Sequence, residues 1–233
     1  MLLGSYDLLV HDLSGFFRLT VLTIFTLVTA VTIHEFSHAL VASALGDNTA
    51  RRLGRLSLNP MRHVDPGGAL MMFIVGFGWG KPVPVDPSQL SRGHTDTALV
   101  ATAGPLSNLM FAFMLAIPFK MGVLVPTSLS LDRVAHVMTG GLREGVADVL
   151  ALLIFFNLLL GVFNLLPLAP LDGSRVLAGF VPREHTAAYG KLQRYGPALL
   201  VAIIMIDFAL GFGFLWGIIG PVVRMLTTVA TGY

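Results

Sequence analysis

The chain has 233 residues, of which 55% are hydrophobic and only 12% are charged, and its formal net charge is +2. Soluble domains usually contain about 25% charged residues, so this composition excludes a soluble enzyme, and the small net charge gives no reason to expect a nucleic-acid partner. Cysteine is absent, and any bound metal must therefore take nitrogen and oxygen ligands.

Four apolar stretches are long enough to cross a bilayer, because a spanning helix needs roughly 20 apolar residues. They cover about residues 16–45, 98–119, 148–168 and 197–220. We therefore predict an all-α polytopic membrane protein with about four transmembrane helices. Residues 1–233 are expected to form a single membrane-embedded domain, since the length leaves no room for a large second one.

A fifth apolar stretch, Gly67 to Gly80, is too short to span as a helix. It is followed by the segment Lys81–Pro87, in which prolines at alternate positions exclude both a helix and a central strand. We predict a re-entrant hairpin or loop over about residues 67–87. Such a segment is permitted at membrane depth where the surrounding protein shields its backbone.

The first apolar stretch ends with the motif His34-Glu35-Phe36-Ser37-His38. Residues i and i+4 lie about 40° apart around a helix and one turn apart along it, so both imidazoles can reach one ion. Glu35 lies beside such an ion, where it can take a proton from the attacking water and pass it to the leaving amine. A chance H-E-x-x-H is disfavoured here, because burying these polar groups in a bilayer costs several kcal/mol.

The distribution of positive charge predicts the orientation. Ten Lys and Arg residues fall in the loops 46–66, 81–97 and 173–196, and five fall on the opposite side. The positively charged side of a membrane protein faces the cytoplasm. We therefore expect the end of the first stretch, with the two histidines, to lie toward the cytoplasmic side of the cell membrane.

Catalytic zinc sites generally have three protein ligands, so a third is needed. Asp172 comes just after the third stretch, and the orientation places it level with His34 and His38, which makes it the favoured ligand on topology. An aspartate in an ordinary Asp-Gly turn is the structural alternative. The other candidates lie in loops, near the N-terminus or in the fourth stretch: His11, His63, His94, His136, His185 and Asp207.

His34–His38 together with Asn164…Pro167…Leu171-Asp172-Gly173 resembles the site-2 proteases, the intramembrane zinc metalloproteases of peptidase family M50. Lys81–Val85 and Ala103–Asn108 are also similar to that family. The resemblance implies one Zn²⁺ per chain held by His34, His38 and Asp172, with Glu35 as general base. It further implies that Asn164 polarises the scissile carbonyl or positions the substrate. No PDZ-like insertion or regulatory nucleotide-binding (CBS) domain fits here, which is typical of the compact prokaryotic branch.

The sequence thus predicts an intramembrane zinc endopeptidase that hydrolyses peptide bonds in or near transmembrane segments of membrane proteins. Regulated intramembrane proteolysis and clearance of signal-peptide-type helices are both compatible with it. A substrate helix must unwind before cleavage, and the extended part of 81–87 could pair with it by strand addition. A catalytically silent homologue that binds membrane proteins and a metal transporter are the alternatives. The sequence does not define the oligomeric state, the natural substrate or the trigger.

Two further polar groups need an explanation. Asp207 lies in the middle of the fourth stretch, and we expect it to be protonated and hydrogen-bonded to a neighbouring helix rather than catalytic. His63 and Asp65 could hold a second metal, but a turn hydrogen-bonded through Asn59 and Asp65 is favoured.

Overall fold

The computed structural model describes residues 6–75, 79–125 and 141–233, and these are mostly helical. Within these ranges there is no β-strand, only an isolated antiparallel bridge between Val64 and Gly80. Five of the helices are long and apolar enough to cross a membrane. The predicted class, an all-α polytopic membrane protein, is therefore confirmed.

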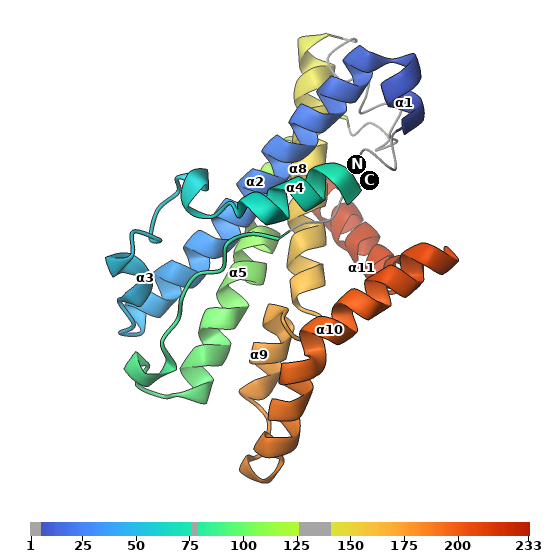
Figure 1. Ribbon diagram of the computed structural model, residues 1–233. Coiled ribbons are helices and arrows are strands. Elements are labelled where there is room, and N and C mark those ends of the chain that lie inside the picture. Colours follow the sequence, from blue (N-terminus) through green and yellow to red (C-terminus); the bar gives the residue numbers. More distant parts are fainter. Residues whose placement is uncertain (1–5, 76–78, 126–140) are drawn as a thin grey trace.

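Three long helices form the centre of the bundle: α2 (Leu13–Ala44), α5 (His94–Leu115) and α8 (Leu142–Asn164). Each of the three contacts the other two, and they alternate in direction (Figure 1). They begin three to six residues before the predicted stretches. Asp12 caps α2 by accepting a hydrogen bond from the Gly15 amide at 2.9 Å, and Gly46 follows the helix with a φ of 110°.

Small side chains allow these helices to approach closely, as is typical of membrane bundles. On α2, Ala30, Ala39 and Ala42 are completely buried. At Gly161 of α8, an added Cβ would lie 3.1 Å from both Leu109 Cδ2 and the Pro105 carbonyl oxygen. The largest apolar core lies where α5, α8 and α11 (Phe214–Thr231) meet, around Ile154, Leu158 and Val223 among others.

The fourth predicted span differs from the structure, because residues 197–220 are divided between two helices. They belong to α10 (Thr186–Leu210) and α11 (Phe214–Thr231). Gly211 and Gly213 between them have φ values of 63° and 64°, the left-handed conformation in which glycine ends a helix. The apolar run is continuous in sequence, so hydropathy alone hides this break.

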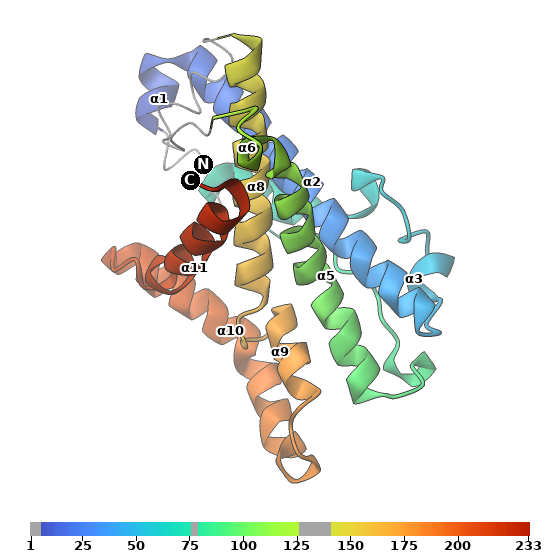
Figure 2. The ribbon, with the colours of Figure 1, turned by 180° about the vertical axis from the view of Figure 1, so that it is seen from behind.

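Together, α10 and α11 connect the two ends of the bundle. α10 begins beside α9 (Asp172–Ala178), whereas α11 ends beside α6 (Ile117–Lys120), where Lys120 Nζ donates to the Val229 carbonyl at 3.2 Å. Figure 2 shows the same course from behind. The pair therefore takes the place of the single fourth span that the sequence predicted.

Asp207 lies in the last turn of α10 and caps the start of α11. Its Oδ1 accepts from the Phe214 amide at 2.7 Å and its Oδ2 from the Leu215 amide at 3.2 Å. The predicted hydrogen bonding to a neighbouring helix is thus confirmed. The expected protonation of the carboxyl group stays a prediction.

The region predicted to be re-entrant contains α4 (Pro66–Val75), followed after residues 76–78 by an extended segment, which we define as Gly80–Asp86. In Figure 1, α4 is drawn in front of the middle of the bundle formed by α2 and α8. Re-entry into the membrane stays a prediction. The remaining short helices are α1 (Tyr6–His11), α3 (Thr49–Arg52), η1 (Pro60–Arg62), η2 (Pro87–Gln89) and η3 (Arg183–His185).

Candidate metal centre

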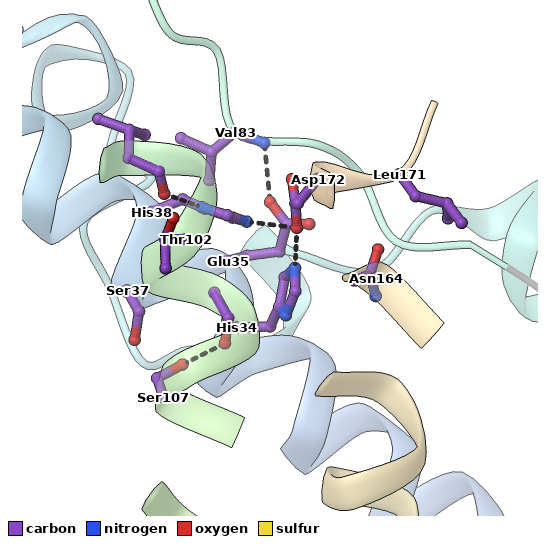
Figure 3. Close-up of polar contacts among 12 residues, drawn as sticks. His34, Glu35, Ser37, His38, Val83, Thr102, Ser107, Asn164, Leu171 and Asp172 are labelled. Atoms are coloured by element: carbon purple, nitrogen blue, oxygen red, sulfur yellow. Dashed lines mark hydrogen bonds and ion pairs between the residues drawn. The ribbon is translucent and has the colours of Figure 1, made fainter. Parts of the chain in front are cut away.

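His34, His38 and Asp172 converge on one point, although Asp172 is 134 residues or more from both histidines in the sequence. The Nε2 atoms of His34 and His38 lie 2.9 Å and 3.1 Å from Asp172 Oδ2. All three residues are buried, and their ligand atoms lie within 4.8 Å of one another. Figure 3 shows both imidazoles on α2 pointing at the carboxylate, which stands at the start of α9.

The tautomer of His38 is fixed by a backbone contact. Its Nδ1 lies 2.7 Å from the Val100 carbonyl oxygen on α5. A carbonyl oxygen can only accept, so Nδ1 carries a proton, and Nε2 is the nitrogen that can offer a lone pair to a bound metal. Nδ1 of His34 is buried and has no hydrogen-bond partner among the described residues. The ring of His38 is thus oriented through its Nδ1 by α5, whereas the described chain offers no such contact to Nδ1 of His34.

Asp172 is suited to be the anionic ligand. Burial raises the pKa of its carboxyl group, but the hydrogen bonds to His34 and His38 outweigh burial, so the pKa lies well below its ordinary value. The carboxylate is therefore the stable form at neutral pH. Gly173, the next residue, packs against the end of α8, where an added Cβ would lie 2.2 Å from the Leu165 carbonyl oxygen.

Gly104 of α5 has no side chain, so the space in front of the two imidazoles stays open. A Cβ on Gly104 would lie 2.4 Å from His38 Nε2 and 2.7 Å from His34 Nε2. The three side chains supply two nitrogens and one oxygen, a ligand set that zinc accepts in catalytic sites, with a fourth position for water or substrate. The residues present therefore fit a zinc ion, which His34, His38 and Asp172 would hold.

Glu35 lies beside this group and not within it, as the motif predicts. It follows His34 on α2 and is half-buried, and its Oε2 accepts a hydrogen bond of 2.8 Å from the backbone amide of Val83 (Figure 3). Val83 belongs to the extended segment Gly80–Asp86. The prolines predict an extended backbone for this segment, but no residue pattern indicates that its amide contacts Glu35.

Asn164 is the last residue of α8 and lies on the α8 side of the cluster in Figure 3. One N–H of its Nδ2 donates to the Leu160 carbonyl at 3.0 Å. A side-chain amide has two such protons, so a second remains for a substrate carbonyl. The functional role of Asn164 stays a prediction.

None of the other sequence candidates within the described residues joins the cluster. His63 Nε2 lies 2.7 Å from the Ser57 carbonyl oxygen. Asp65 Oδ1 accepts from the Gly68 amide at 2.8 Å, and Asn59 Oδ1 accepts from the Met61 amide at 3.0 Å. These contacts confirm the turn and give no second metal group among the described residues. His94 and His185 lie outside the cluster, and His136 lies outside the described residues.

A buried His–His–Asp group with a glutamate beside it, inside a bundle of long apolar helices, defines a membrane-embedded zinc metalloprotease. The chain belongs to peptidase family M50, whose family model matches residues 22–206. The resemblance to the site-2 proteases is thereby confirmed.

Relatives agree with this assignment. The chain is 37% identical over 193 residues to "Putative zinc metalloprotease YwhC" of Bacillus subtilis, covering 83% of each chain. It is 30% identical over 177 residues to "Putative zinc metalloprotease Rip2" of Mycobacterium tuberculosis, covering 74% of this chain and 62% of that one. No solved structure matches the chain at a significant level.

Proposed function

We propose that the protein is an intramembrane zinc endopeptidase that cleaves peptide bonds in or near transmembrane segments of membrane proteins. One observation carries the proposal: three buried ligand atoms, from His34, His38 and Asp172, lie within 4.8 Å of one another between apolar helices, with Glu35 alongside. One zinc ion per chain is the expected cofactor.

The residues around the cluster fit peptide hydrolysis. Bound zinc would polarise the scissile carbonyl and lower the pKa of a water. Glu35 would take the proton of that water and deliver it to the leaving amine, because its carboxylate stands beside the ligands. The second N–H of Asn164 would hold the substrate carbonyl. His38, fixed by the Val100 carbonyl, keeps its orientation through these steps.

The extended segment Gly80–Asp86 is the candidate binding site for an unwound substrate. It runs past Glu35, and the side chains of Val83 and Val85 pack on the same apolar cluster with Ala39 of α2. Amides of alternate residues share one edge of an extended segment. The Val83 amide is already bonded to Glu35, so the Val85 amide is the donor left for strand pairing on that edge.

The orientation toward the cytoplasm is part of the proposal. The C-terminal ends of α2 and α9 and the N-terminal end of α5 lie at one end of the bundle (Figure 1). The loops attached to these ends carry most of the Lys and Arg residues, which supports a cytoplasmic location.

The test compares the wild type with Glu35→Gln and with Glu184→Gln, which changes an exposed glutamate away from the cluster. Each protein is purified in detergent, its zinc is measured by elemental analysis, and cleavage of a membrane-spanning reporter is followed. We expect about one zinc in all three proteins and cleavage by the wild type and Glu184→Gln only. Equal cleavage by Glu35→Gln would reject Glu35 as the base.

The same experiment separates the alternatives. A silent homologue would hold zinc and leave the reporter intact in every variant. A transporter would move zinc into proteoliposomes without cleavage. The structure gives the transporter no support, because Asp207, the acidic residue that a path through the membrane could have used, caps α11.

A further inference from the structure

Arg55 is a charged residue in an unusual position. It is only 7% exposed, yet the recorded contacts of its guanidinium within the described part of the chain are all with backbone carbonyl oxygens. Nη1 donates to the Arg62 carbonyl and Nη2 to the carbonyls of Lys81 and Pro82, the last at 2.9 Å. Nε is buried and has no partner among the described residues. Burying a guanidinium without a carboxylate is costly, so its position needs a reason.

Arg55 and Glu35 bind opposite ends of the same peptide group, between Pro82 and Val83. The carbonyl of Pro82 and the N–H of Val83 belong to the same planar unit. Nη2 of Arg55 binds the carbonyl at 2.9 Å, and the N–H donates to Glu35 Oε2 at 2.8 Å. A cation at one end of an amide and a carboxylate at the other polarise it in the same direction, which strengthens both hydrogen bonds.

Contacts on both sides of the Pro82–Val83 peptide fix the position of the segment Gly80–Asp86. The Lys81 amide donates to the His63 carbonyl at 2.7 Å, and the Asp86 amide donates to Asp47 Oδ2 at 2.7 Å. Near its start the segment lies close against α2, because an added Cβ on Gly80 would be 2.8 Å from Val31 Cγ1. Pro82 and Pro84 have no N–H, so between these anchors Val83 is the donor aimed at Glu35.

We propose that Arg55 is a positioning residue for Glu35 and acts through the Pro82–Val83 peptide. The guanidinium holds the peptide, and the peptide holds the carboxylate beside the metal ligands. This inference rests on the proposed role of Glu35 as general base. Without Arg55 the carboxylate would turn between rotamers, and the geometry needed in the transition state would be populated less. The His–His–Asp group would be unaffected, and the contacts of the Lys81 and Asp86 amides would still hold the two ends of the segment for substrate binding.

The kinetic test uses Arg55→Met, Arg55→Lys and a matched control, Arg51→Met, which removes the same charge from an exposed position four residues earlier. We expect Arg55→Met to lower kcat about 10- to 100-fold, the usual cost of losing a group that orients an active residue. KM should stay within about twofold and zinc content at the wild-type level. Arg55→Lys should recover part of kcat, because an ammonium can still bind the Pro82 carbonyl. Arg51→Met should match the wild type.

A second readout does not depend on cleavage. The segment Trp79–Asp86 contains only six backbone N–H groups, because Pro82 and Pro84 have none, so hydrogen exchange there reports on few amides. Exchange at Val83 should be faster in Arg55→Met and in Glu35→Ala than in the wild type, and unchanged in Arg51→Met. Arg55→Met should also lower kcat by no more than about twofold in a Val83→Pro background, since residues on one path do not act additively.

The outcomes are distinguishable. Wild-type kcat in Arg55→Met, or loss of zinc together with a lower unfolding temperature, would overturn the positioning role. If Arg55→Met lowered kcat as much in the Val83→Pro background as in the wild type, the proposal that Arg55 acts through Val83 would be rejected. If the wild type cleaves no reporter but exchange at Val83 still responds to both Arg55→Met and Glu35→Ala, the link holds and the proposed function fails. Unchanged exchange in both variants rejects the link whatever the activity.

Discussion

Gly104 of α5 faces His38 of α2 so closely that a Cβ on the glycine would lie 2.4 Å from His38 Nε2. The same Cβ would lie 2.7 Å from His34 Nε2. Both nitrogens are ligand atoms of the candidate metal centre. The approach of α5 to α2 therefore sets the size of the space available to a metal beside the two nitrogens. The backbone of Gly104, which has no side chain, borders this space.

Gly104→Ala is expected to remove zinc and cleavage together. The methyl group would occupy the space in front of the two nitrogens, and either the imidazoles turn away or α5 shifts, at a cost of about 1–3 kcal/mol. Elemental analysis should show zinc reduced at least about tenfold. Gly217→Ala in α11 is the control, because nothing lies within 4 Å of the added Cβ. Full zinc occupancy in Gly104→Ala would show that metal binding does not need the space between Gly104 and the two imidazoles.

Asp172→Ala should lose zinc while the bundle stays folded. The carboxylate is the only oxygen ligand in the candidate group, and its loss leaves two imidazoles, fewer than a catalytic zinc site uses. We expect the affinity to fall by more than the about 10- to 100-fold typical of residues that only orient a ligand. Titration with a competing chelator measures it. Asp207→Asn serves as the matched control, and unchanged affinity in Asp172→Ala would exclude this residue as the third ligand.

The parts of the site that were predictable from sequence depend on regular local geometry or on topology. His34 and His38 share a helix face because of the helical repeat, and Asp172 was placed by the side of the membrane on which the third span ends. The contacts that orient the site are different. The Val100 carbonyl and the Val83 amide are backbone groups, and their partners are far away in sequence. No residue pattern marks them.

The role of Arg55 could not be predicted from the sequence either. In the sequence Arg55 counts as one more positive charge of a loop predicted to be cytoplasmic. Its burial against three carbonyls follows only from how η1 and the segment Gly80–Asp86 fold onto each other. The break between α10 and α11 was missed because hydropathy averages over Gly211-Phe212-Gly213. Asp207 was the available signal: an acidic residue in an apolar run can mark a helix start that needs a cap.

Asp207→Ala should lower stability without affecting the metal. Two amides at the start of α11 would lose their acceptor, and loss of such a cap typically costs about 1 kcal/mol. For a chain of this length we expect the Tm in detergent to fall by about 2–4 °C. Asp207→Asn should fall between the wild type and Asp207→Ala, since its amide keeps one acceptor oxygen and replaces the other with a donor. A fall in zinc content in Asp207→Ala would contradict a purely structural role.

Val85→Pro should weaken substrate binding and leave the metal centre intact. The substitution removes one N–H on the edge that faces the site, and proline is compatible with an extended backbone. In contrast to Val83, Val85 has no recorded amide contact with the rest of the described chain, so the base is not disturbed. Loss of one hydrogen bond worth about 1 kcal/mol would raise KM for a membrane-spanning reporter about fivefold. Val85→Ala, which keeps the amide, is the control for the lost side chain. An unchanged KM in Val85→Pro, with normal zinc content, would rule out strand pairing at this edge.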